Sequence, residues 1–97
     1  MNIIKTRNDD TLEVKLEGRL DSPSSAELSA SLQEEEDYAD IRFDCEKLEY
    51  ISSAGLRVFF ACRKKLGEKQ HVVLTKVNAL VREILRISGF DKQVTLE

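Results

Sequence analysis

The chain has 97 residues and a mass of 11.1 kDa, which is enough for one compact domain over residues 1–97 and too little for two. Hydrophobic residues make up 41% and charged residues 34%, so the composition favours a chain that buries a core over a disordered one. The formal net charge of −3 argues against general binding to nucleic acid or directly to an anionic membrane. A protein partner fits this charge better.

The sequence predicts a cytoplasmic protein without a metal or a cofactor. The first residues resemble no secretory leader, and no apolar run approaches the roughly 18–20 residues that span a bilayer. Cys45 and Cys62 lie in segments with apolar periodicity and lack CxxC spacing. The single histidine, His71, is too isolated to complete a ligand set with them. We therefore interpret both cysteines as reduced structural thiols.

The chain is predicted to begin with a β-hairpin. Ile3 and Ile4 open a short strand, residues 8–10 supply turn residues, and residues 12–16 alternate apolar and charged side chains. This alternation indicates a hairpin with one buried face.

A helix is predicted after the hairpin. Either Ser22, which precedes Pro23, or the capping-box spacing of Ser24 and Glu27 would begin it. The acidic run at residues 34–37 would end the helix as a solvated surface. The buried stripe of this helix is predicted to be narrow and to consist of Ala26, Leu28, Ala30 and Leu32.

The rest of the chain is predicted to alternate between strands and helices. The strands are expected at residues 41–45, 71–75 and 94–96, and the helices from near Ser52 to Gly67 and from the cap Asn78 to Gly89. The order β-β-α-β-α-β-α-β predicts a single α/β domain. It would hold one mixed β-sheet, in which an N-terminal antiparallel hairpin is followed by parallel strands joined by helical crossovers.

The most informative segment is Ser52-Ser53-Ala54-Gly55-Leu56, which lies where a predicted strand turns into a helix. Backbone N–H groups at such a turn lack partners within the helix and can bind an anion. Alternatively, Ser52 or Ser53 only caps the helix, which is worth about 1 kcal/mol, and Ala54 and Gly55 permit close packing. Local sequence leaves both interpretations open.

Residues 48–58, Leu-Glu-Tyr-Ile-Ser-Ser-Ala-Gly-Leu-Arg-Val, resemble the signature of the STAS domain. The likeness is to the bacterial anti-sigma factor antagonists in particular, whose usual form is Asp-Ser-Ser/Ala-Gly-Leu. Residues 18–21 resemble the upstream Gly-x-Leu-Asp element of that family, and residues 78–90 resemble its late helix and the turn after it. Ser52 stands where the family often has Asp, and Ala54 where it often has a second Ser. The resemblance covers nearly the whole chain and implies the STAS fold.

The resemblance also implies a function, that of an anti-sigma factor antagonist without enzymatic activity. The unphosphorylated form would bind an anti-sigma factor serine kinase with a histidine-kinase-like ATPase fold, and the sigma factor would be released. Phosphorylation of Ser53, which aligns with the family's phosphorylated serine, would end that binding, and a serine phosphatase would reverse it. Such a protein is expected to be a monomer that heterodimerises. The residues expected at the partner surface are Asp21, Ser52, Ser53, Ala54, Gly55 and Arg57.

Three alternatives remain at this stage for individual residues. Asp21 is as well suited to cap the first helix as to contact a partner. Ser52 is a second candidate for the modification. Arg57 lies one helical turn after Ser53, where it would meet a phosphate or a partner carboxylate or would simply be solvated.

Other functions compete with this one. The chain could be a STAS-type regulatory subunit bound constitutively to a transporter ATPase or membrane carrier, in which Ser53 is only a helix cap. It could also bind a nucleotide at the helix N-terminus near Ser53. An enzyme has little support, because the sequence has no GxxxxGK[ST] phosphate loop and no defensible Ser/His/Asp arrangement.

Overall fold

The structure is a computed structural model that describes residues 1–67 and 69–97. The predicted order of strands and helices is confirmed, with one short 3₁₀ helix added before the last strand. The elements are β1 (Asn2–Asn8), β2 (Thr11–Leu20), α1 (Ser22–Gln33), β3 (Asp40–Ile51), α2 (Ser53–Lys65), β4 (Val72–Thr75), α3 (Ala79–Ser88), η1 (Phe90–Lys92) and β5 (Thr95–Leu96).

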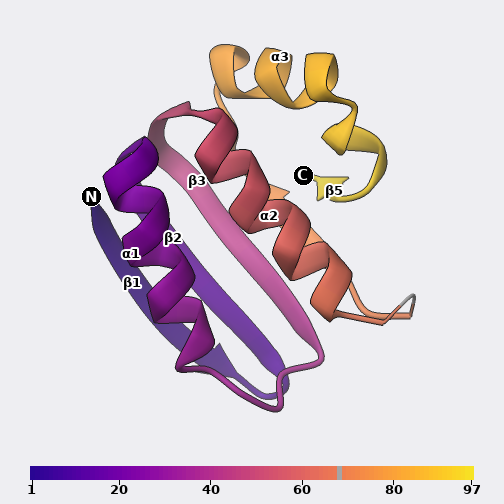
Figure 1. Cartoon of the computed structure of the whole chain (residues 1–97). Helices are drawn as coiled ribbons and strands as arrows, with labels where there is room; N and C mark the ends of the chain where they lie inside the picture. Colours follow the sequence, from indigo (N-terminus) through magenta and orange to yellow (C-terminus); the bar gives the residue numbers. More distant parts are fainter. Residues whose placement is uncertain (68) are drawn as a thin grey trace.

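The five strands form one mixed sheet in the order β1-β2-β3-β4-β5. β1 pairs antiparallel with β2, and each of the other neighbouring pairs is parallel, as the hairpin and the crossovers predict. Figure 1 shows α1 and α2 side by side across one face of the sheet, with α3 near the end at which both of them begin. Because β2 and β3 are parallel, the two helices that follow them start at the same end of the sheet.

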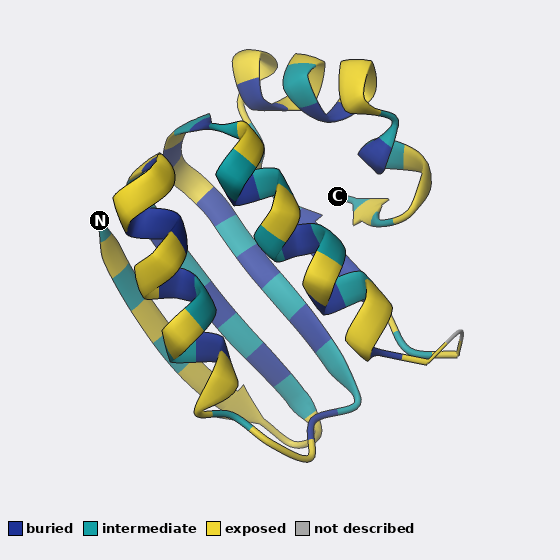
Figure 2. Cartoon of the chain, viewed as in Figure 1, coloured by how far each residue is buried: buried dark blue, intermediate teal, exposed yellow. Residues whose placement is uncertain are grey.

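The core lies between the sheet and the helices. Buried and half-buried residues alternate along β2 and the first half of β3, which gives the stripes seen in Figure 2. The ring of Phe59 in α2 packs edge-on against that of Phe43 in β3, with 4.7 Å between the ring centroids. The fully buried side chains of the strands are Leu12, Val14, Leu16, Leu20, Ile41, Phe43, Cys45, Leu48, Ile51 and Leu74.

β2 and β3 are longer than predicted. Their pairing has two register shifts, and after Cys45 the next buried positions of β3 are Leu48 and Ile51, each three residues on. The period-two pattern therefore stops before the strand does. Gly18 adopts φ +113° at one of these irregularities, a conformation that L side chains rarely adopt. The extension brings the ends of both strands to the Ser52 segment.

The start of α1 confirms Asp21 among the three caps that the sequence offers and excludes the other two. The helix is capped by Asp21, whose carboxylate accepts a hydrogen bond from the backbone N–H of Ser24 at 3.1 Å. The hydroxyl of Ser24 accepts in return from the N–H of Asp21 at 2.9 Å, which completes a capping box. Neither Ser22 nor the Ser24–Glu27 spacing caps the helix, because the carboxylate of Asp21 already occupies that position.

The predicted buried stripe of α1 was wrong at two positions. Ala26 and Ala30 are exposed, whereas Ser24 and Ser25 are buried together with Leu28 and Leu32. Residues two apart lie on opposite sides of a helix, so the alanines cannot share a face with the two leucines.

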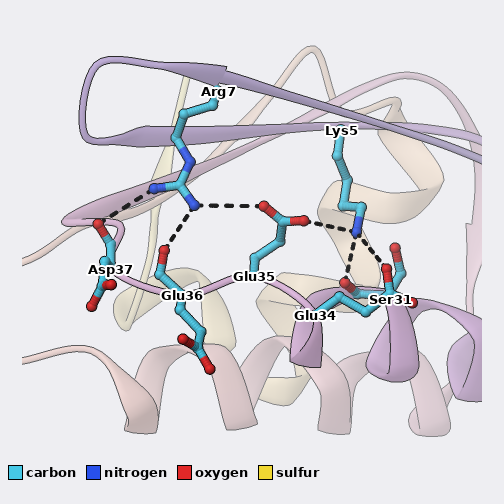
Figure 3. A network of polar contacts seen from close by, with 7 residues as sticks. All are labelled: Lys5, Arg7, Ser31, Glu34, Glu35, Glu36 and Asp37. Atoms are coloured by element: carbon cyan, nitrogen blue, oxygen red, sulfur yellow. Dashed lines mark hydrogen bonds and ion pairs between the residues drawn. The ribbon is translucent and has the colours of Figure 1, made fainter.

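The sequence suggested that the acidic run after α1 is only a solvated surface. In the structure this run also contacts the edge strand β1. Lys5 of β1 donates hydrogen bonds to the carbonyl of Ser31 at 2.9 Å and to the carboxylate of Glu35 at 3.0 Å (Figure 3). Arg7 lies 3.5 Å from the other oxygen of Glu35 and donates to the carbonyl of Glu36 at 2.8 Å. These contacts join the end of α1 to the edge strand, although ion pairs near a protein surface add little stability.

The last helix ends as predicted but buries only part of its apolar surface. Asn78 caps α3, and Gly89 after it adopts φ +78°. Val81 and Leu85 are buried, whereas 53% of Leu80 and 72% of Ile87 are exposed. Cys45 and Cys62 are buried and unpaired, as predicted. Within the described residues, no helix is long and apolar enough to cross a membrane.

Candidate functional site

The turn from β3 to α2 gives the two adjacent serines different roles. The hydroxyl of Ser52 caps α2 by accepting from the N–H of Gly55 at 3.2 Å, and the N–H of Ser52 donates to the carbonyl of Leu20 at 2.9 Å. Ser53 is the first residue of the helix and is exposed. Its hydroxyl makes no hydrogen bond to any described residue. The capping alternative is thus resolved: Ser52 caps the helix, and Ser53 presents an accessible hydroxyl.

Gly55 places the start of α2 tightly against the strand ends. It is buried, and a Cβ at this position would lie 2.7 Å from Cδ2 of Leu20 and 2.9 Å from Cγ1 of Ile51. Real Cβ atoms essentially never approach other atoms so closely. Gly55 therefore shapes the site by letting the helix approach the sheet, while half-buried Ala54 and exposed Ser53 form its outer surface.

Asp21 lies beside this turn. The last cross-strand pair of β2 and β3 is Leu20 with Ile51, so Asp21 and Ser52 leave the sheet next to each other. Hydrogen bonds from the hydroxyl and the N–H of Ser24 lower the pKa of the Asp21 carboxyl below its ordinary value, and the charge of Arg19 adds a smaller effect in the same direction. Asp21 is therefore exposed, anionic and fixed in orientation. That it contacts a partner stays a prediction.

Helix N-termini gather at this end of the sheet. α1 and α2 begin directly after the paired strand ends, and the amide of Asn78 at the start of α3 donates to the carbonyl of Leu48 in β3 at 3.1 Å. Helix N-termini carry partial positive charge, and their first N–H groups have no partner within the helix. Negative charge at Ser53 is consequently compatible with the fold.

Arg57 lies where the sequence predicts, one helical turn after Ser53, and is exposed. Its guanidinium makes no ion pair with the described residues. Leu56 between them is half-buried and packs partly against the core. All six residues predicted for the partner surface thus lie at the adjacent starts of α1 and α2, although Gly55 among them is buried.

Two further residues, Arg19 and Tyr50, lie at the same strand ends and were not predicted from the sequence. They pair across β2 and β3, and the guanidinium carbon of Arg19 lies 4.6 Å from the centroid of the Tyr50 ring. No local pattern links two residues this far apart in the chain. Only the parallel register of β2 and β3 would have identified this pair. Arg19 and Tyr50 each stand one residue before the end of their strand, so aligning the two strand ends places them side by side.

Nothing at this site indicates a metal. In the part of the chain that the structure describes, no group of three or more His, Cys, Asp or Glu side chains is arranged to hold an ion. A groove of about 190 Å³ lies between α1 and α2, lined by residues that include Leu32, Val58 and Lys65. None of the residues predicted for the partner surface lines it.

The comparisons with known proteins identify the family. The family model described as "Mlab, STAS domain" matches residues 4–97. The candidate anti-sigma factor antagonist BtrV of Bordetella bronchiseptica is 37% identical over 93 residues, which cover 93% of this chain and 80% of BtrV. This chain belongs to the STAS domain family. The resemblance of its motifs to that family is confirmed.

Solved structures confirm the STAS fold. A candidate anti-sigma factor antagonist from Thermotoga maritima superimposes with a TM-score of 0.88 at 18% identity, covering 97% of this chain and 84% of that one. The anti-sigma factor antagonist SpoIIAA in its unphosphorylated form superimposes with a TM-score of 0.85 at 17% identity, covering 99% of this chain and 88% of that one. The Bacillus cell fate determinant SpoIIAA in its phosphorylated form superimposes with a TM-score of 0.74 at 16% identity, covering 99% of this chain and 91% of that one.

Proposed function

We propose that this STAS domain is an anti-sigma factor antagonist whose binding is controlled by phosphorylation of Ser53. In the unphosphorylated state it binds an anti-sigma factor that is also a serine kinase, and the sigma factor is released. The observation that carries the proposal is the division between the two serines: Ser52 is held as a cap, and Ser53 is exposed. The name of BtrV and the two states of SpoIIAA support it.

The same geometry explains how a phosphate switches binding without unfolding the domain. Phosphorylation adds about −1.5 to −2 charges at neutral pH. At Ser53 this charge sits at a helix N-terminus, and Arg57 is within reach because residues four apart are neighbours on a helix surface. The fold therefore tolerates the phosphate. Against a partner packed closely on Ser53 and Ala54, the same charge is desolvated and sterically excluded, so binding is lost.

Binding measurements with Ser53 variants test the proposal. The serine-kinase-type anti-sigma factors encoded in the source genome are purified and titrated one by one with the wild type, Ser53→Ala and Ser53→Asp. We expect one of them to bind the wild type and Ser53→Ala, and to bind Ser53→Asp at least about tenfold more weakly, a change of about 1.4 kcal/mol. Equal binding of Ser53→Asp and the wild type would contradict the proposal.

Phosphorylation by the same factor with ATP provides a second readout. We expect peptide mass spectrometry to find phosphate on Ser53 in the wild type and in Ser52→Ala, and none in Ser53→Ala. Ser52→Ala serves as the matched control: it loses the cap and about 1 kcal/mol of stability but keeps the acceptor. Phosphate on Ser52 would reassign the site. If the affinity does not depend on the residue at position 53, and if the protein from growing and from stressed cells carries no phosphate, a constitutive regulatory subunit would be favoured.

A further inference from the structure

Arg19 and Tyr50 lie at the strand ends that carry the Ser53 site, but on another face of the sheet. Each precedes a buried residue, Leu20 in β2 and Ile51 in β3, that points toward the helices. Beyond the last register shift the pairing is regular again, so alternation between these last two cross-strand pairs turns Arg19 and Tyr50 toward the face that α1 and α2 leave open. Arg19 is exposed and Tyr50 is half-buried.

The guanidinium of Arg19 lies over the ring of Tyr50, and its hydrogen-bond donors have no acceptor among the described residues. Its carbon lies 4.6 Å from the centroid of Tyr50, and among the described residues it makes no ion pair and donates no hydrogen bond. A cation–π contact of this kind uses no N–H hydrogen bond, so the donors of the guanidinium stay available. By contrast, four other arginines donate to acceptors within the fold: Arg7, Arg42, Arg63 and Arg86.

This arrangement has the properties of a binding contact for a carboxylate. Arginine and tyrosine are the residue types enriched among the energetically dominant contacts of protein interfaces. An arginine already held by an aromatic ring loses less side-chain entropy when it binds. Its planar fork matches a carboxylate, to which it can donate two parallel hydrogen bonds.

We propose that Arg19, stacked on Tyr50, binds an Asp or Glu side chain of the same protein partner that contacts Ser53. The partner surface thus continues from the start of α2 across the ends of β2 and β3 onto the open face of the sheet. This inference rests on the proposed function, because the partner is the anti-sigma factor proposed above. It adds two residues and the chemical class of the group that they recognise.

The test uses the same titration with variants at the pair and a charge-matched control. Arg19→Ala is expected to weaken binding about tenfold, and Arg19→Lys to restore only part of it, because an ammonium cannot donate the bidentate pair. Tyr50→Leu is expected to weaken binding as well. The double variant Arg19→Ala/Tyr50→Leu should weaken binding by less than the product of the two single fold-changes, because the two side chains act together. Lys64→Ala removes the same charge from the far end of α2 and should bind like the wild type.

The outcomes separate this inference from the proposed function. If Ser53→Asp weakens binding and Arg19→Ala does not, the carboxylate contact is overturned and the proposed function stands. If no anti-sigma factor binds, or if Ser53→Asp binds like the wild type, both are overturned. An effect of Arg19→Ala confined to the phosphorylated protein also overturns the contact, because it assigns Arg19 to the phosphate. Circular dichroism and urea unfolding show that each variant is folded.

Discussion

Replacing Gly55 with alanine tests how tightly the start of α2 is packed against the sheet. The new methyl group would lie 2.7 and 2.8 Å from two carbons of Leu20 and 2.9 Å from Cγ1 of Ile51. Both side chains are essentially inaccessible to solvent, with exposures of 0% and 1%, so they have no free space into which to move. The helix or the strand ends must therefore shift.

Two opposing effects set the magnitude of this change. Inserting one methyl group into a packed core costs about 1–3 kcal/mol. Alanine in place of glycine in a helix returns about 1 kcal/mol through its helix propensity. We therefore expect Gly55→Ala to lower the free energy of unfolding by about 1 kcal/mol, which is about 4–8 °C in Tm for a domain of this size.

Urea unfolding of Gly55→Ala, two other single variants and one double variant measures this effect. Gly67→Ala is the matched control, because the nearest atom to its Cβ is 3.7 Å away, and it should cost nothing or stabilise slightly. Leu20→Ala removes two of the three crowded carbons. In that background, the further loss caused by Gly55→Ala should shrink toward zero. A Gly55→Ala protein at least as stable as the wild type, or an equal effect of Gly55→Ala in both backgrounds, would show that Leu20 and Ile51 do not crowd this position.

Two further predictions concern titratable groups. The pKa of Asp21 is lower in the folded than in the unfolded chain, chiefly because of the hydrogen bonds between Asp21 and Ser24. The ionised carboxylate therefore stabilises the fold above its ordinary pKa of 3.8, and this stabilisation is lost as the pH falls through the folded-state pKa. The stability advantage of the wild type over Asp21→Asn should therefore shrink below about pH 4. Urea unfolding midpoints of both proteins between pH 7 and 3 measure this change. A difference in stability that stays constant with pH would be inconsistent with the capping box. Burial raises the pKa of the Cys45 thiol to about 12 and that of Cys62 to about 11, so neither should react with a thiol reagent at pH 8 until the protein unfolds. Fast labelling of either cysteine in the native protein, followed by mass spectrometry, would contradict this expectation.

The order of strands and helices could be predicted because each element has a local signal. Alternation identifies the start of β2 and β3, and Asn78 and Gly89 delimit α3. The ends of β2 and β3 could not be predicted, because register shifts break the alternation and only the pairing of the two strands keeps them extended. Local sequence left Asp21, Ser22 and Ser24 as alternative caps of α1 for a related reason: where the helix begins depends on where the strand before it stops.

The same distinction separates the parts of the candidate site that could be predicted from those that could not. Ser52, Ser53 and Gly55 are contiguous, so a motif finds them even before their roles are known. Arg19 and Tyr50 become neighbours only through the long-range register of two parallel strands. Similarly, the pairing of Lys5 with Glu35 joins the edge strand to the end of α1 and has no local sequence signal.

The capping role of Ser52 also accounts for its departure from the aspartate that the family often has at this position. Serine and aspartate are about equally good N-caps, since either side chain supplies an oxygen to the N–H groups of the first turn. The hydroxyl of Ser52 accepts from the N–H of Gly55, so the substitution keeps the cap and removes only a charge. The geometry that exposes Ser53 is therefore preserved without the carboxylate. What differs is the electrostatics beside the acceptor hydroxyl, where Asp21 from the neighbouring strand end is the fixed negative charge.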